Sequence, residues 1–180
     1  MDRLRTESLL LDPLAREDFS WLFALYADAE VMRYIGRGVR TEEESRRNLD
    51  WLVAHGERLP FGYWVLRERA TGARLGGAVL MIRREGAPAE LGFMLARPAW
   101  GRGLATQVAR ALVAHAFADL TLPELQAFTD VGNGASAAVL RKAGMRDRGL
   151  CPGPYGGLDR RFELTREEWL SSRAAGDGAR

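Results

Sequence analysis

The stretch from residue 90 to residue 129 limits the fold more than any other part of the chain. Residues 90–95 and 125–129 have strand character, and residues 104–117 carry apolar side chains at helical spacing. A strand, a helix and a strand within about 40 residues predict one βαβ unit, with parallel strands and a right-handed crossover. We therefore expect the sheet to contain at least one parallel pair of strands.

The remaining segments predict strands of the opposite kind and several helices. Residues 63–67, 75–82 and 90–95 are joined by short turns, which predicts an antiparallel meander. Further strands are expected at 8–14, 146–151 and 161–164, and further helices at 16–27, 41–55, 133–144 and from 165 onward. The sum is an α+β fold, a mixed and mostly antiparallel sheet flanked by helices.

Length and composition set the broad class of protein. A chain of 180 residues is expected to form one domain, here over residues 1–173, with 174–180 as a disordered tail. The net charge of +2 argues against a nucleic-acid partner. No apolar run reaches about 18 residues and no signal peptide is recognisable, which predicts a cytoplasmic protein without a membrane partner. Cys151 is the only cysteine, so no internal disulfide can form, and we expect no metal site.

The glycines before the helix at 104–117 indicate an anion-binding site. A helix start carries unsatisfied amides and a partial positive charge. At the start of the helix at 41–55, Thr41 can cap these amides and three glutamates supply negative charge. The helix after Gly103 has no acid in its first turn. Gly101 and Gly103 allow successive amides to point at one spot, so a ligand is expected to supply the anion. Arg102 adds charge.

Other interpretations of this glycine pair remain open. Two glycines can simply form a turn from strand to helix. A dinucleotide site of the Rossmann type would require a third glycine where Thr106 stands, and repeated βαβ units. A P-loop is excluded because no Gly-Lys-Ser/Thr follows.

The stretch E-L-G-F-M-L-A-R-P-A-W-G-R-G-L-A-T resembles motif A of the GNAT acyltransferase superfamily. Within it, the chain is similar to the branch of the ribosomal-protein N-terminal acetyltransferases RimJ and RimL. The segments A-E-V-M-R-Y-I-G and N-G-A-S-A-A-V-L-R-K-A-G-M also resemble that branch, and the likeness covers about residues 3 to 169. It implies a single GNAT domain whose central βαβ unit binds the co-substrate acetyl-CoA.

The resemblance also implies roles for particular residues. The family pattern Q/R-x-x-G-x-G/A falls on residues 100–105, where Gly103 and Ala105 match and Trp100 replaces the basic or amide residue. The amides of this loop and the first helical turn would hold the pyrophosphate of coenzyme A, at Trp100, Gly101, Arg102, Gly103, Leu104, Ala105 and Thr106. The backbone of Phe93, Met94 and Leu95 would pair with the pantetheine arm. Asn133 would meet the cofactor near its thiol.

Acetyl transfer to an amine requires a proton acceptor, and Glu90 is the candidate. On a strand, Glu90 shares one face with Gly92 and Met94, and Gly92 is expected to leave empty space beside the carboxylate. The alternative is a solvated carboxylate at the start of a strand. His115 is interpreted as a packed histidine, and Cys151 has no basic neighbour in sequence that would activate it.

Ser136 is the candidate general acid for the leaving thiolate, one turn after Asn133. Alternatively, Ser136 only satisfies the backbone of its helix, and water protonates the thiolate. Many family members carry a tyrosine acid at the position where Leu140 stands, so the identity of the acid is open.

We therefore expect an N-acetyltransferase that moves the acetyl group of acetyl-CoA to a primary amine by direct attack in a ternary complex. The acceptor would be a protein N-terminus or a small-molecule amine, and a homodimer is compatible with the sequence. A non-catalytic acyl-CoA sensor is the main alternative, and a nicotinamide-dinucleotide-binding protein fits less well.

Overall fold

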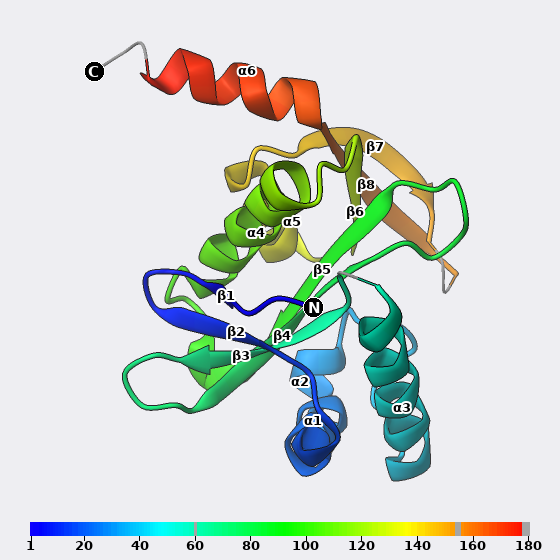
Figure 1. Ribbon diagram of the computed structural model, residues 1–180. Helices are drawn as coiled ribbons and strands as arrows, with labels where there is room; N and C mark the ends of the chain where they lie inside the picture. The colour runs from blue at the N-terminus through cyan, green and yellow to red at the C-terminus, as the bar shows by residue number, and fades with distance from the viewer. Residues whose placement is uncertain (60, 154–155, 178–180) are drawn as a thin grey trace.

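The computed structural model describes residues 1–59, 61–153 and 156–177. Within these residues, eight strands form one sheet in the order β1-β2-β3-β4-β5-β6-β8-β7 (Figure 1). The strands are β1 (Leu4–Arg5), β2 (Leu9–Pro13), β3 (Tyr63–Glu68), β4 (Arg74–Met81), β5 (Ala89–Leu95), β6 (Glu124–Asp130), β7 (Arg146–Pro152) and β8 (Leu158–Thr165). The helices are α1 (Phe19–Ala27), α2 (Ala29–Met32), α3 (Glu42–Arg58), α4 (Leu104–Ala114), α5 (Gly134–Lys142) and α6 (Arg166–Asp177).

The sheet confirms the predicted α+β class and its central unit. β3, β4 and β5 form the antiparallel meander, and β5 and β6 are parallel and joined through α4. The other neighbouring strands of the sheet are antiparallel. Since β8 returns between β6 and β7, the last hairpin places β7 at one edge of the sheet, and β1 lies at the other.

Two hydrophobic cores lie on the two faces of the sheet. The larger contains the buried side of α4, with Val108 and Leu112 packed on the odd-numbered residues of β5. The smaller lies under α1 and α3, where Leu22 and Leu52 pack with residues of β3 and β4. Figure 1 shows α1, α2 and α3 grouped together, apart from α4 and α5. The predicted alternation of β5 is confirmed, because Leu91 joins the first core while Met94 packs against the second.

Helix boundaries follow their capping residues. Thr41 and Glu44 form the predicted capping box of α3, with the Glu44 amide donating to the Thr41 hydroxyl at 3.2 Å. The segment predicted as one helix at 16–27 begins instead as a 3-10 turn, Arg16–Asp18. A short helix that was not predicted, α2, starts where Asp28 accepts hydrogen bonds from two backbone amides. The strand β1 was also not predicted, because its two residues are too few to show a periodic pattern.

The C-terminal part of the chain differs from expectation at two points. α4 ends at Ala114 and continues as a π-helical turn, His115–Asp119. His115 is 2% exposed and meets the Trp64 ring edge-on, which confirms that it is a packed histidine. α6 continues to Asp177, so residues 174–177 of the expected tail are helical, while 178–180 fall outside the described residues.

Within the described part of the chain, none of the helices combines the length and the apolar character needed to cross a bilayer.

Candidate functional site

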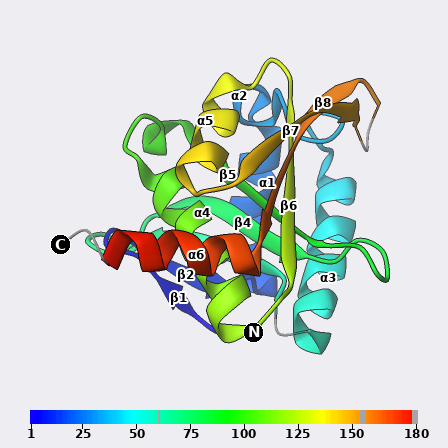
Figure 2. The same cartoon turned by 90° about the horizontal axis from the view of Figure 1, so that it is seen from above.

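β5 and β6 separate shortly after they pair. Their register contains only Ala89 opposite Leu125 and Glu90 opposite Gln126, although β5 continues to Leu95 and β6 to Asp130. Figure 2 shows the two strands running apart, with α5 near the wide end. β6 stays paired with β8 along its whole length, so the opening lies on the β5 side of β6. The predicted pantetheine residues Phe93, Met94 and Leu95 therefore lie on a strand edge that no described strand covers.

The start of α4 has the geometry of an anion nest. Gly103 is the N-cap residue with a φ of 74°, and Gly101 has a φ of 72°, both in the left-handed region that favours glycine. The amides of Thr106 and Gln107 already donate to the Gly103 carbonyl at 3.1 and 3.3 Å. The first-turn amides before them have no helical carbonyl to bind. No side chain caps this end, and no acid lies in its first turn.

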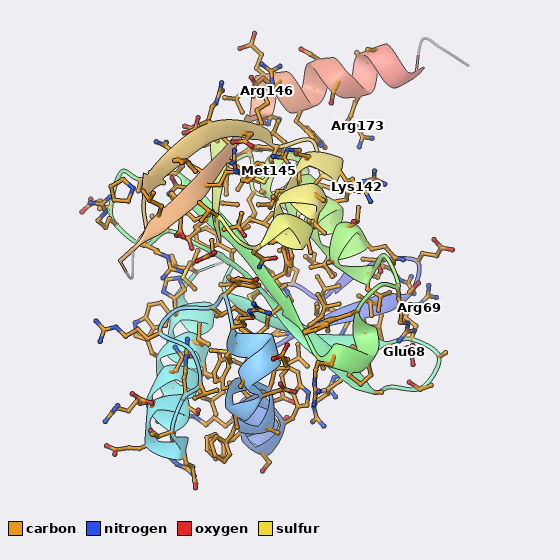
Figure 3. All side chains as sticks on the ribbon, turned by 180° about the vertical axis from the view of Figure 1, so that it is seen from behind. Glu68, Arg69, Lys142, Met145, Arg146 and Arg173 are labelled. Carbon is orange, nitrogen blue, oxygen red and sulfur yellow. The ribbon has the colours of Figure 1, made fainter. Side chains whose placement is uncertain are left out.

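Two neighbours of the nest are held by other parts of the chain. The Trp100 indole donates to the Leu95 carbonyl at 2.7 Å, which ties the glycine loop to the end of β5. The Arg102 guanidinium forms an ion pair with Glu68. The pKa of Glu68 is lowered by the Thr71 hydroxyl first and by Arg102 second. Figure 3 shows Glu68 at the β3–β4 turn, on the side where α4 begins. Arg102 thus reaches toward that turn, and a role for its charge in phosphate binding stays a prediction.

A cavity of about 300 Å³ passes through the opening between β5 and β6. Glu90, Gly92 and Met94 line it from the face of α1 and α3, and Leu91 and Phe93 from the opposite face. Three residues of α5 and its cap, Asn133, Ser136 and Leu140, complete that second side. The structure therefore brings both predicted catalytic residues and Asn133 to one cavity, with Glu90 and Ser136 on opposite sides of the sheet.

Asn133 and Ser136 are joined by a helix cap. The Asn133 Oδ1 accepts from the Ser136 amide at 3.1 Å, which fixes the start of α5. The Asn133 amide nitrogen is not used in this bond. Among the residues that the structure describes, the Ser136 hydroxyl has no hydrogen-bond partner, and the residue is half-buried in the cavity wall. This hydroxyl is available to a ligand.

Glu90 is held more firmly than its sequence suggested. Both carboxylate oxygens accept from Arg83, at 2.6 and 2.7 Å, and the side chain is 13% exposed. Gly92 lines the cavity beside Glu90, but the space in the direction of its missing side chain is not empty. A Cβ built on Gly92 would lie 2.9 Å from Val79 Cγ1, because Val79 stands directly opposite on β4 and fills that volume. A substrate could therefore approach Glu90 only from the cavity that this residue lines.

Two acids of the cavity, Asp130 and Asp159, escaped the sequence analysis. They are direct partners across β6 and β8, so their side chains point to the same face of the sheet. The pKa of Asp159 is raised by burial, and further by the charges of Asp130 and Glu90. Each lies just beyond a predicted strand, at 125–129 or 161–164, and only the order of β6 and β8 places them together. In the described ranges no group of His, Cys, Asp and Glu is arranged to hold a metal ion.

The floor of the cavity on the side of α1 and α3 is aromatic and basic. The Arg40 guanidinium lies 4.2 Å from the centroid of the Tyr26 ring, whose hydroxyl donates to Asn48 at 3.0 Å. Tyr63 lies beside them, and burial raises its pKa well above the ordinary value. Arg33 stacks over Tyr34 at 5.2 Å. Tyr34 and Ile35, which follow α2, also line the cavity, whereas Met32 is fully buried.

Comparison with known proteins gives this arrangement a family context. The model of the acetyltransferase (GNAT) domain family matches residues 8–146. The FsC-acetyl coenzyme A-N(2)-transacetylase of Aspergillus fumigatus is 33% identical over 186 aligned positions, which cover 93% of this chain and 77% of that protein.

Solved structures share the fold at lower identity. A GNAT-family acetyltransferase from Bacillus anthracis superimposes with a TM-score of 0.80 at 22% identity, covering 92% of this chain and 99% of that one. RimL, the ribosomal L7/L12 alpha-N-protein acetyltransferase in complex with coenzyme A, has a TM-score of 0.79 at 16% identity, covering 91% and 98%. RimL is thus one neighbour among acetyltransferases of several kinds, and the RimJ/RimL branch is not singled out.

Proposed function

The chain belongs to the GNAT acetyltransferase family, and we propose that it transfers the acetyl group of acetyl-CoA to a primary amine by direct attack in a ternary complex. Membership makes it an acyltransferase of a family that performs acetyl-CoA-dependent N-acetylation. The observation that carries the finer proposal is the opening between β5 and β6, because the cavity there is lined from both faces of the sheet.

The residues present fit coenzyme A along one continuous path. The amides around Gly101 and Gly103 suit a diphosphate, since they lie at a helix start without an acid. From there the open edge of β5 at residues 93–95 offers backbone groups to the amides of a pantetheine arm. Asn133, at the wide end of the opening, has a side-chain donor beside the place where the thioester would lie.

The two sides of the cavity suit the two reactants. An acceptor amine can enter from the face of α1 and α3, while the leaving thiol lies toward α5. The amine nitrogen then meets the thioester carbon through the opening, and nitrogen–carbon bond formation accompanies carbon–sulfur cleavage. Cys151 lies on the edge strand β7 and does not line the cavity, so an acyl-cysteine intermediate has no support.

Glu90 and Ser136 take the proton-transfer roles in this proposal. Glu90 accepts the proton of the attacking amine, while Arg83 holds the carboxylate in one orientation. Ser136 lies on the thiol side with an available hydroxyl and donates to the departing sulfur.

The proposal is tested by release of free CoA from acetyl-CoA with and without added amines. We expect release that depends on both substrates. Glu90→Gln should keep the affinity for acetyl-CoA and lower turnover by about 100-fold or more. If the protein binds acetyl-CoA but no added amine causes the release of free CoA, the protein is instead a non-catalytic sensor of acyl-CoA.

Glu163→Gln is the matched control for this variant. Glu163 has a similar exposure of 14%, is also paired with arginine, and does not line the cavity. Both variants remove a carboxylate charge from an arginine-paired strand residue, so both should cost similar stability. If Glu90→Gln retains as much turnover as Glu163→Gln, then Glu90 is not the proton acceptor.

A further inference from the structure

The acceptor end of the cavity carries opposite charges at two separate places. Asp130 and Asp159 lie on β6 and β8, whereas Arg33 and Arg40 belong to the segment between α1 and α3. Glu90 and Arg83 also line the cavity but pair with each other. The two aspartates therefore form an acidic region and the two arginines, Arg33 and Arg40, form a basic region, and both regions face the same cavity.

The acidic region lacks an internal counter-charge. Asp130 and Asp159 face each other across β6 and β8, and like charges in direct cross-strand pairs are destabilising. Asp130 accepts the Gly132 amide at 2.7 Å. Among the described residues neither carboxylate forms an ion pair, and the raised pKa of Asp159 reflects burial and the neighbouring acids. An ammonium group bound between them would offset that repulsion.

The basic region is arranged on aromatic rings. Arg40 stacks on Tyr26, and its backbone amide donates to the Tyr26 carbonyl at 3.1 Å, which fixes its position at the end of α1. Arg33 stacks on Tyr34. Within residues 1–59, 61–153 and 156–177 neither guanidinium forms an ion pair, although the charge of Arg40 helps to lower the pKa of Glu44 and opposes the rise in the pKa of Tyr63. Stacking leaves the N–H edges of a guanidinium free for a carboxylate.

We propose that the acceptor is a small zwitterion of the amino-acid class, with its amine toward Asp130 and Asp159 and its carboxylate toward Arg40 and Arg33. This inference rests on the proposed function and names its substrate class. An amine without a carboxylate would leave the basic region unpaired, and the N-terminus of a longer peptide carries no carboxylate near its amine. The exposed ring of Trp51 and the buried Leu52 supply an apolar wall for the side chain of the acceptor.

Matched amines test the carboxylate requirement. Leucine is compared with leucinamide and 3-methylbutylamine, and phenylalanine with phenylalaninamide and phenethylamine. A short peptide beginning with leucine represents a protein N-terminus. We expect kcat/KM, expressed per unprotonated amine, to be about 10-fold or more higher for the amino acid, as for loss of a hydrogen bond to a charged group. Equal or higher values for the amides, the bare amines or the peptide would overturn the inference.

Arginine variants then locate the carboxylate contact. Arg40→Gln should lower the ratio of kcat/KM for leucine to that for 3-methylbutylamine about 10-fold, and Arg40→Lys should restore part of it. Arg37→Gln is the control, since Arg37 is exposed on the same segment and does not line the cavity. A ratio that falls equally in Arg37→Gln would also overturn the inference.

The outcomes separate this inference from the function on which it rests. If bare amines are acetylated as well as amino acids are, the zwitterionic acceptor is rejected, whereas the proposed N-acetyltransferase function is retained. Absence of turnover with every amine, while acetyl-CoA still binds, removes both.

Discussion

At the scale of single residues, Gly103 and Gly72 share a backbone conformation in different surroundings. Their φ angles are 74° and 73°, and a Cβ on either would meet no atom within 4 Å. Alanine at each position should therefore cost a similar strain of roughly 1 kcal/mol. Only Gly103→Ala is expected to weaken acetyl-CoA binding, by about 10-fold or more, because its methyl group would project into open space at the helix start, where the diphosphate is expected to lie.

Titration calorimetry measures the affinity of both variants and chemical denaturation measures their stability. Gly72→Ala supplies the control for strain, since Gly72 lies in the turn between β3 and β4. If the two variants bind acetyl-CoA equally well, the glycine loop is only a bend in the chain.

Asp159 leads to a prediction about pH. Its raised folded-state pKa means that the folded protein holds this proton more tightly than the unfolded chain does. The associated stability is complete below the ordinary aspartate pKa of about 4 and is lost as pH rises through the raised value. The Asp159→Asn variant has no carboxyl group at this position, so it does not lose this stability as the pH rises. It should match the wild type near pH 4 and exceed it near neutrality, by up to about 1 kcal/mol.

Urea unfolding of both proteins between pH 4 and 8 tests this expectation. The two proteins share their other titrating groups, so the difference between the curves isolates Asp159 and its neighbours. A difference that does not change with pH, or a less stable variant at pH 7, would show that the Asp130–Asp159 pair does not repel.

At the scale of elements, the cap of α3 determines how firmly one wall of the cavity is held. The Thr41 amide and hydroxyl both contact Glu44, and the Glu44 amide donates back to Thr41. Thr41→Ala should lower the unfolding free energy by about 1 kcal/mol, while Thr41→Ser retains most of it. Thermal denaturation measures both variants. Equal stability of the alanine and serine variants would mean that the hydroxyl bond contributes nothing.

Elements governed by local signals were predictable from sequence. The capping box placed α3, the apolar spacing placed α4, and alternation assigned the faces of β5. The glycine loop was recognisable because an uncapped helix start is a local feature. α2 was missed because one turn of helix has no periodicity, and its start depends on the single side chain of Asp28.

Contacts between distant segments could not be predicted in the same way. Nothing near Gly92 in sequence indicates that Val79 fills its space, because that follows from the register of β4 and β5. The pair of Arg83 with Glu90 requires the turn between the same strands to close. Asp130 and Asp159 come together only because β8 lies next to β6. Motifs therefore indicated several residues that the structure brings to one cavity, and they missed those whose place depends on strand order.

At the scale of the whole molecule, the two cores lie on the two faces of the sheet, and the opening between β5 and β6 connects those faces. One core supports α4 and the glycine loop before it, and the other supports α1 and α3, on the side where we propose that the acceptor enters. The two halves of the sheet meet at only two paired residues on each strand, Ala89 with Leu125 and Glu90 with Gln126. A ligand that lies along β5 would add contacts where the sheet itself has few.

Acetyl-CoA is therefore expected to stabilise the whole fold and not only the loop that holds its phosphates. At a concentration of about 100 Kd, binding to the folded state alone adds about 2.7 kcal/mol to the unfolding free energy. For a chain of this length each kcal/mol corresponds to roughly 2–4 °C, so the melting temperature should rise by about 5–10 °C.

Scanning calorimetry with acetyl-CoA, and with NAD at the same concentration, measures this shift. NAD shares the adenosine diphosphate part but lacks the pantetheine arm that would lie along β5, so its shift should be small. An equal rise with both ligands would mean that only the shared adenosine diphosphate part is recognised and that the open edge of β5 binds nothing.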